Sequence, residues 1–317
     1  MKLIEKLRVY FWGFKTLQNE IKISESDKFE NDRIAGELMR NTHSIEKGLS
    51  IAKPRLGYGH KIQLAMLERI EKLQKCSNSA YYNEVIGMAV DSLSSYIKYH
   101  DEKNFTDDVI EQIRQFVKNY EYDNSCMLGG SVLINKQDMI FDIKEIERFF
   151  YARHSIRDYD DSDVSDEVIQ KALRLAQRAP SACNRQGVRA YVLSKKLTRD
   201  MAQTLEGIGG FADSVNRFIL VTGKLSSYRS NENRQFIVSS SIYAAYLSLT
   251  LHLYGVGACI VQRPLTLNTE WECLRKNLKI DEDEHLVLML AIGNLKDQVK
   301  VPLSHRVDAD SIFKFLN

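Results

Sequence analysis

The chain has 317 residues, of which 44% are apolar and 27% charged. This is the composition of a globular protein with one or two domains, and it excludes disordered, collagen-like and disulfide-scaffold chains. Lys and Arg number 44 against 42 Asp and Glu, so the net charge of +2 does not favour nucleic acid or an anionic membrane as a general partner.

The five cysteines are widely spaced and form no C-x-x-C pair, which is typical of neither a disulfide framework nor a zinc ribbon. Free thiols fit a reducing compartment. The N-terminus lacks the apolar core of a secretory signal, and the sequence has no run of about 18 apolar residues. We therefore expect a cytoplasmic protein without a metal site.

The first half is predicted to be almost wholly helical. Its apolar spacing and its Gly and Pro breakers predict helices over 1–18, 28–49, 60–76, 79–100, 106–121 and 143–152. Strand-like alternation occurs in this half only at 131–134. We expect residues 1–145 to form a helical domain of their own.

The first helix has an apolar face that includes Leu7, Phe11 and Phe14, with basic residues mostly off that face. One interpretation is an interfacial helix that rests on the inner face of a membrane. The other, which we favour because such helices are more often packing elements, is an amphipathic helix packed on its own protein. Contact of residues 1–18 with a membrane surface stays open.

From about residue 150 the pattern becomes mixed. Ser165 is predicted to cap a helix that ends before Pro180, and a long helix is expected at 232–254. The predicted strands are 189–193, 217–222, 258–261 and 285–292. The last of these is apolar throughout, as in a strand buried on both faces. Residues 146–317 are thus expected to form an α+β domain with long helices packed on a sheet.

A first polar cluster opens this half. Arg153, Ser155 and Arg157 can converge on one anionic group, and a phosphate suits two guanidiniums and a hydroxyl. The alternative is a solvated basic turn whose arginines pair with the aspartates at 158–163. The residues alone favour neither the phosphate site nor the solvated turn.

A second cluster follows at residues 179–186, where a helix runs into a strand. Its small residues would let a flat ligand approach the backbone, and Asn184 and Gln186 each offer a donor and an acceptor. The alternative is a helix C-terminal turn with Asn184 in a left-handed conformation. Taken alone, this cluster favours the turn.

Together, R-x-S-x-R at 153–157 and A-P-S-A-x-N-x-Q at 179–186 resemble the flavin-binding half of the nitroreductase family. The resemblance continues with G-V-G-A-C-I at 255–260, H-L-V-L-M-L-A-I-G at 285–293 and P-L-S-H-R at 302–306. It covers about 146–317 and implies a nitroreductase-like sheet flanked by long helices. It also implies a homodimer with flavin mononucleotide (FMN) at the subunit interface, NAD(P)H as co-substrate, and the helix at 232–254 as the candidate dimer core.

The resemblance implies which residues hold the cofactor. Arg153, Ser155 and Arg157 would hold the FMN phosphate, ribityl chain and pyrimidine edge, and Arg306 would return to the phosphate. Backbone amides around residues 262 and 263 would approach N5, the atom that accepts hydride. The whole implied set is Arg153, His154, Ser155, Arg157, Pro180, Ser181, Ala182, Cys183, Asn184, Gln186, Gln262, Arg263 and Arg306.

In this family the cofactor performs the chemistry, and the protein orients it. Hydride would pass from NAD(P)H to N5 and then to a small-molecule acceptor by a ping-pong scheme, so we expect no catalytic side chain. Family members often have glycine where Arg263 stands, and its guanidinium could narrow the pocket or bind an anionic acceptor.

The first half has its own motif, H-x-x-E-K-G-L at 43–49. His43 and Glu46 could be two metal ligands on one helical face, but no second ligand pair is evident, so a metal is not expected. The motif, in front of a nitroreductase-like domain, resembles flavoproteins encoded with polysaccharide-biosynthesis enzymes. We therefore expect an FMN-dependent NAD(P)H oxidoreductase of surface-polysaccharide biosynthesis. The alternative is a non-catalytic flavin-binding partner or regulator of a polysaccharide assembly.

Overall fold

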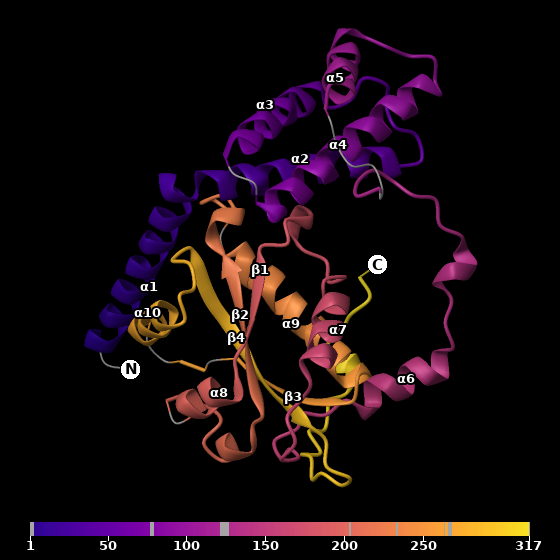
Figure 1. Cartoon of the computed structure of the whole chain (residues 1–317). Helices are drawn as coiled ribbons and strands as arrows, with labels where there is room; N and C mark the ends of the chain where they lie inside the picture. Colours follow the sequence, from indigo (N-terminus) through magenta and orange to yellow (C-terminus); the bar gives the residue numbers. More distant parts are fainter. Residues whose placement is uncertain are drawn as a thin grey trace.

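The computed structural model describes residues 3–76, 79–120, 127–202, 204–232, 234–262, 264–265 and 268–316. Figure 1 shows a group of helices from the first half at one end of the molecule and a sheet covered by helices on both faces at the other. A long connection, residues 127–142, loops out between them and leads into the next helix.

The predicted helices of the first half are confirmed to within a few residues. They are α1 (Leu3–Ser24), α2 (Glu30–Ser50), α3 (His60–Cys76), α4 (Ala80–Asp101) and α5 (Asp108–Lys118). Helices α2 to α5 share one apolar core, in which Leu38, Met66, Ile70, Leu93 and Ile110 are fully buried. Their faces repeat at the 3.6-residue period that predicted them.

The described part of the apolar face of helix α1 is not buried on its own chain. Leu7, Tyr10, Phe11 and Phe14 are between 58% and 72% exposed, and the buried residues among the described side chains of this helix, Glu20 and Ser24, lie in its last turns. The expectation that this face packs on the protein itself is therefore wrong for these residues. The helix itself is confirmed, but a sequence pattern does not show what covers its apolar face.

An exposed arm, residues 131–151, joins the two halves. Every residue from 131 to 148 is exposed, and only helix α6 (Ile143–Ala152) and one short turn, residues 136–139, give it regular structure. Residues 131–134 do not form a strand, which corrects the expectation from their alternation. A strand needs a neighbour to accept its hydrogen bonds, and the described part of the chain offers none there.

The second half contains a four-stranded antiparallel sheet in the order β1-β2-β4-β3. All four strands were predicted: β1 (Val188–Val192), β2 (Arg217–Lys224), β3 (Val256–Val261) and β4 (Glu284–Asn294). Two short helices, α8 (Lys195–Ala202) and α10 (Asn268–Asn277), were not predicted.

Both faces of this sheet are covered. Helices α7 (Asp166–Ala176) and α9 (Gln235–Leu253) pack on one face with Ile219, Val221 and Leu290. Residues from α8 and α10 pack on the other face with Phe218 and Leu220. Neighbours in β2 alternate between the two cores, which is why the central strands are apolar without a break.

Helix α9 is the one helix in the described chain that is long and apolar enough to cross a membrane by length and composition. Its residues Tyr243, Ala244, Leu247 and Leu251 are buried against the sheet and α7. This packing accounts for its apolar composition as a core helix. Val238, Tyr246 and Leu253 remain exposed on its outer side.

The halves meet where α2 lies on the turn after β2. Gly36 is required there, because a Cβ atom on it would lie 2.7 Å from the carbonyl oxygen of Ser227. Across the same junction Arg229 makes a two-pronged ion pair with Glu37, at 2.7 Å for each bond, and Lys224 lies 3.1 Å from Asp32. Close contact and charge therefore join the halves.

Candidate cofactor site

The first cluster and the C-terminal segment line one cavity of about 320 Å³. Arg153 follows the last residue of α6, and Ser155 is held against β3 by a parallel bridge to Ala258. Residues 302–306 form the opposite wall, so Arg306 is brought beside a cluster about half the chain away in sequence. Of the residues implied to hold the phosphate, Arg153, Ser155 and Arg306 thus line one cavity, together with His154.

The aspartates near this cluster pair elsewhere. Asp158 accepts a hydrogen bond from Lys296 at 2.5 Å, and Asp163 accepts one from Arg217 at 2.8 Å. Asp160 accepts a hydrogen bond from the backbone amide of Ser162 at 2.9 Å. Within the described chain, no ion pair involves any of the three arginines 153, 157 and 306. The cavity also has no carboxylate in its lining. This arrangement favours the anion site over the paired basic turn.

Arg157 lies apart from that cavity. Its side chain is exposed, and its carbonyl accepts a hydrogen bond from the Ser214 hydroxyl at 3.3 Å. Burial raises the pKa of the neighbouring Cys259 thiol, and the charge of Arg157 opposes that rise. Its implied contact with a flavin therefore stays a prediction.

The second cluster is a strained turn before β1. Cys183, Asn184 and Gln186 all have positive φ, between 49° and 52°, a region that is sparsely populated by residues other than glycine. The Ser181 hydroxyl accepts from the Gln186 amide at 3.0 Å and closes the turn. The left-handed Asn184 expected of a helix C-terminal turn is present, but it is one of three left-handed residues among the four from 183 to 186, with Arg185 in a right-handed conformation between them.

Arg185 holds this turn, and sequence reasoning missed it. Its side chain is 1% exposed, forms a two-pronged ion pair with Glu232, and donates to the carbonyls of Ala182 and Ser227 at 3.2 and 3.3 Å. Its guanidinium carbon also lies 4.7 Å from the ring centre of Tyr228. No local signal reveals this role, because the partner Glu232 is far along the chain.

One copy of the chain does not bring the two clusters into a single cavity. Pro180, Ser181 and Gln186 line a separate cavity of about 460 Å³ between α4, α7, α9 and β1. Ala182, Cys183 and Asn184 are half-buried, and Gln262 is exposed at the end of β3. Arg263 lies outside the described residues.

The motif of the first half is largely structural. A Cβ atom on Gly48 would lie 2.2 Å from the Tyr58 ring, and the Tyr58 hydroxyl donates to the Ile45 carbonyl at 3.0 Å. His43 Nδ1 lies 3.6 Å from Glu46 Oε2, both half-buried. Helix α2 contacts residues 182–184 of the strained turn, so this helix lies beside the second cluster.

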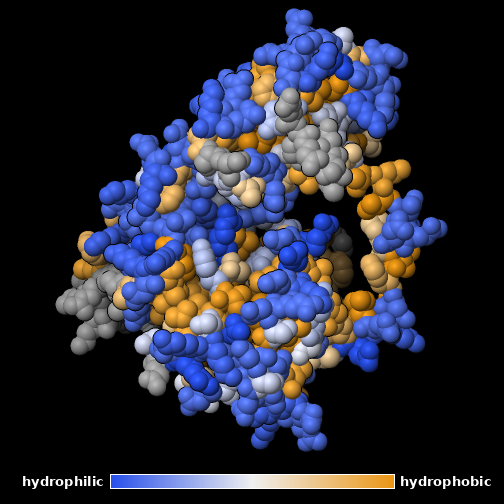
Figure 2. Space-filling view, viewed as in Figure 1, coloured by the Kyte–Doolittle hydropathy of each residue, from blue (hydrophilic) through white to orange (hydrophobic). Residues whose placement is uncertain are grey.

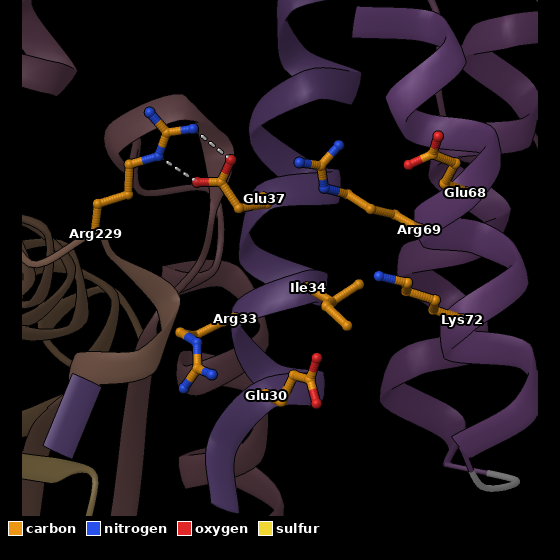
Figure 3. Close-up of a pocket in the computed structure, with 8 residues that line it drawn as sticks. All are labelled: Glu30, Arg33, Ile34, Glu37, Glu68, Arg69, Lys72 and Arg229. Carbon is orange, nitrogen blue, oxygen red and sulfur yellow. Dashed lines mark hydrogen bonds and ion pairs between the residues drawn. The ribbon is translucent and has the colours of Figure 1, made fainter. Parts of the chain in front are cut away.

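A further cavity, of about 360 Å³, lies at the junction of the halves. Figure 3 shows Arg229 reaching to Glu37 on α2, while Arg69 and Lys72 extend from α3 toward the same helix. The Arg33 guanidinium donates a hydrogen bond to the carbonyl of Ser24 at 3.2 Å. Four basic and three acidic side chains line this cavity, so its charges are nearly balanced. The cavity lined by Arg153 and Arg306, in contrast, has no acidic residue in its lining.

Comparison with known proteins finds a family similar to part of the second half. The family model described as Nitroreductase family matches residues 151–213, a range that contains both clusters. The matched range opens the second half, residues 146–317, which we therefore call the nitroreductase-like half. A protein of Archaeoglobus fulgidus, provisionally named NADH dehydrogenase/NAD(P)H nitroreductase, is 26% identical to this chain over 159 residues, which is 49% of this chain and 88% of that protein.

Solved structures similar to the nitroreductase-like half include two flavin-related proteins. An FMN-dependent nitroreductase of Clostridium difficile is 24% identical, with 53% of this chain and 98% of that chain covered and a TM-score of 0.44. A protein of Desulfovibrio desulfuricans, provisionally described as a nitroreductase and crystallised in complex with FMN, is 20% identical over 54% of this chain and 96% of that chain, with a TM-score of 0.47.

Proposed function

We propose that the protein is an FMN-dependent oxidoreductase that passes hydride between NAD(P)H and a small-molecule acceptor. One observation carries this proposal: Arg153, Ser155 and Arg306 line one cavity that has no carboxylate in its lining. The FMN phosphate carries nearly two negative charges, and two guanidiniums without acidic partners can neutralise them. The match of the family model to residues 151–213 supports the same conclusion.

Each of the two clusters fits one part of FMN. The phosphate would be held by Arg153, Ser155 and Arg306, and the small side chains of the strained turn leave its backbone open to a flat ring. The amides of Asn184 and Gln186 can pair with a ring edge that alternates carbonyls and N–H groups. Arg185 holds the backbone of this turn through Ala182, Ser227 and Glu232, so it would position the binding residues without touching FMN itself.

FMN, when bound, supplies hydride transfer in two successive half-reactions, first from NAD(P)H and then to the acceptor. The protein binds the phosphate, positions the ring and excludes water. No side-chain nucleophile is required. Reduction and oxidation of the acceptor use the same site geometry, so the direction depends on the substrate supplied.

We also propose a homodimer, because the chain leaves a large apolar surface uncovered. Ten large apolar side chains on the arm and six on the tail, residues 302–316, are exposed. At roughly 100 Å² each they expose on the order of 1,600 Å² per copy over the arm and the tail together. Figure 2 shows apolar residues along the arm and an opening between the arm and the body. A second copy would cover these surfaces and would bring a second pair of clusters to the interface.

We also propose a pathway and a cellular location, each of which rests on a single feature of the chain. A place in surface-polysaccharide biosynthesis rests on the motif at 43–49, and a non-catalytic flavin-binding role in such an assembly is the alternative. A cytoplasmic location with α1 on the membrane surface rests on its exposed apolar face, which includes Tyr10, Phe11 and Phe14.

Absorbance and flavin content of the purified protein test the proposal. We expect yellow protein that contains FMN, and we expect R153Q and R306Q to reduce FMN affinity at least tenfold while R199Q, a change at an exposed arginine on α8, leaves it unchanged. Anaerobic NAD(P)H should bleach the bound flavin. Protein that fails to take up FMN would refute the proposal, and a flavin that NAD(P)H does not reduce would favour the non-catalytic alternative.

A further inference from the structure

The 460 Å³ cavity beside the strained turn is built by both halves of the chain. Tyr81 and Glu84 of α4 form one side, and residues of α7, α9, β1 and the strained turn form the rest. Its volume lies within the range of small-molecule sites. Tyr81 and Glu84 come from the helical half, so the cavity exists in this form only where the two halves meet.

The cavity carries an excess of positive charge. Arg174 and Arg189 line it, and Glu84 is its one acidic lining residue. Neither arginine takes part in an ion pair among the described residues. Arg174 is exposed at the cavity and Arg189 is half-buried in its wall. Two guanidiniums without ion-pair partners favour an anion, since arginine keeps its charge at every physiological pH.

Arg189 is fixed in place before any ligand arrives. One of its terminal nitrogens donates to the carbonyls of Val188 and Gln186 at 2.7 and 3.2 Å, and its guanidinium carbon lies 5.2 Å from the ring centre of Tyr81. These contacts restrain the side chain but engage only one of its three nitrogens. The other donors remain available to an anion at little further cost in side-chain entropy.

The rest of the lining suits a ring with hydroxyl groups. Leu173, Val188 and the Tyr81 ring supply apolar surface, and Ser239 and Tyr243 supply hydroxyls from α9. Burial raises the pKa of Tyr243 to about 12, so its hydroxyl remains a proton donor at neutral pH. Cationic groups beside apolar and hydroxyl-bearing walls match a phosphate ester attached to a sugar or a base.

We propose that this cavity binds the phosphate-ester part of a reactant that exchanges hydride at the neighbouring cofactor site. The proposal rests on the proposed function, because Ser181 and Gln186 belong both to this cavity and to the implied flavin-lining set. The reactant is either NAD(P)H, through its pyrophosphate, or a phosphorylated acceptor. Both share the chemistry that Arg174 and Arg189 recognise.

Binding by calorimetry tests the proposal on full-length protein saturated with FMN, so that the cofactor's own phosphate cavity is occupied. The probes are ADP and adenosine. We expect ADP to bind, adenosine to bind at least tenfold more weakly, and both R174Q and R189Q to weaken ADP at least tenfold. R178Q is the matched control, because Arg178 is exposed near the end of α7 and does not line the cavity. Circular dichroism checks that each variant is folded.

The same samples separate the two proposals. Yellow protein that does not bind ADP, or that binds it equally well after R174Q and R189Q, overturns the cavity assignment and leaves the proposed function standing. Colourless protein that still binds ADP with loss in both variants refutes the proposed function but keeps the phosphate-ester site. The reactant is then identified by NADPH and UDP-glucose: the ligand whose affinity falls in R174Q and R189Q but not in R178Q is the one bound.

Discussion

Gly48 of the first-half motif packs against Tyr58, which lies in the loop that follows the motif. Gly48 gives the Tyr58 ring room beside α2, and the Tyr58 carbonyl in turn accepts from Tyr96 at 3.0 Å and Gln63 at 2.9 Å. A sequence signature that suggested ligand chemistry thus serves mainly to fasten the loop 54–59 to the helical half. His43 and Glu46 are the part of the motif that this role does not use.

Replacing Gly48 by alanine should destabilise the protein. The added methyl group would overlap the Tyr58 ring, and relieving such overpacking costs about 1–3 kcal/mol. Chemical denaturation followed by circular dichroism measures the free energy of unfolding. Gly209→Ala is the control, because nothing lies within 4 Å of its Cβ position. Equal stability of the two variants would show that the Tyr58 loop is not held as described.

Glu37 makes the junction of the halves sensitive to acid. Burial opposes its ionisation, but hydrogen bonds from Arg229 and Arg40 outweigh burial and lower the pKa of Glu37 from 4.5 to about 2. A carboxyl whose folded-state pKa is lowered contributes stability above its unfolded pKa. That contribution is lost as the pH falls from about 4.5 toward 2.

The E37Q variant isolates this contribution. At pH 7 we expect it to be less stable than the natural protein, because glutamine cannot form the charged bonds to Arg229 and Arg40. As the pH falls from about 4.5 to 2, the difference in the free energy of unfolding should shrink toward zero. Denaturant titrations at a series of pH values measure it, and a difference that stays constant would exclude the ion pairs as its cause.

At the scale of elements, long helices and central strands follow from local pattern. Helices α8 and α10 were missed because each is short, polar and dependent on packing; Trp271 of α10, for example, is 5% exposed beneath the sheet and donates to the Glu284 carbonyl at 3.2 Å. The arm is the opposite case. Its apolar residues are visible in the sequence, but only the fold reveals that the chain itself does not cover them.

The arm should therefore decide the oligomeric state. Leu133 is 98% and Phe141 69% exposed, so the double variant L133S/F141S loses little packing within one chain. We expect unchanged circular dichroism but a dimer dissociation constant raised at least tenfold, measured by analytical ultracentrifugation. I51S/L197S is the control, with two exposed apolar residues that lie outside the arm and the tail. A monomeric natural protein, or a dimer indifferent to L133S/F141S, would contradict this role.

At the scale of the whole molecule, the helical half and the nitroreductase-like half have separate apolar cores. One core is built within α2 to α5 and the other on the two faces of the sheet. They are joined by close packing of α2 on the turn after β2, by apolar contact of Ile23 with the cluster of Leu225, Tyr228 and Phe236, and by the ion pairs of Glu37 with Arg229 and Asp32 with Lys224. A division near residue 145 into two domains remains a proposal that this arrangement supports.

Removing the junction charges should uncouple the halves. Trp12 and Trp271 are the two tryptophans, so in a Trp12→Phe background fluorescence reports the second half through Trp271, whereas circular dichroism at 222 nm is dominated by helices of both halves. With the junction intact we expect the two thermal transitions to coincide, and in D32N/E37Q to separate. Transitions that remain coincident in D32N/E37Q would mean that other contacts couple the halves.

The sequence by itself determined the α+β class, the position of most elements and the residues of both polar clusters, because these follow from local periodicity, turn chemistry and motif spacing. Only the tertiary structure decided which of these residues meet. Arg306 reaches Arg153 because the C-terminal segment returns past β3, Arg185 fixes the strained turn through Glu232, and Tyr81 meets Arg189 because α4 lies against the second half. Each of these contacts joins residues distant in the chain, and a sequence pattern carries no information on such distances.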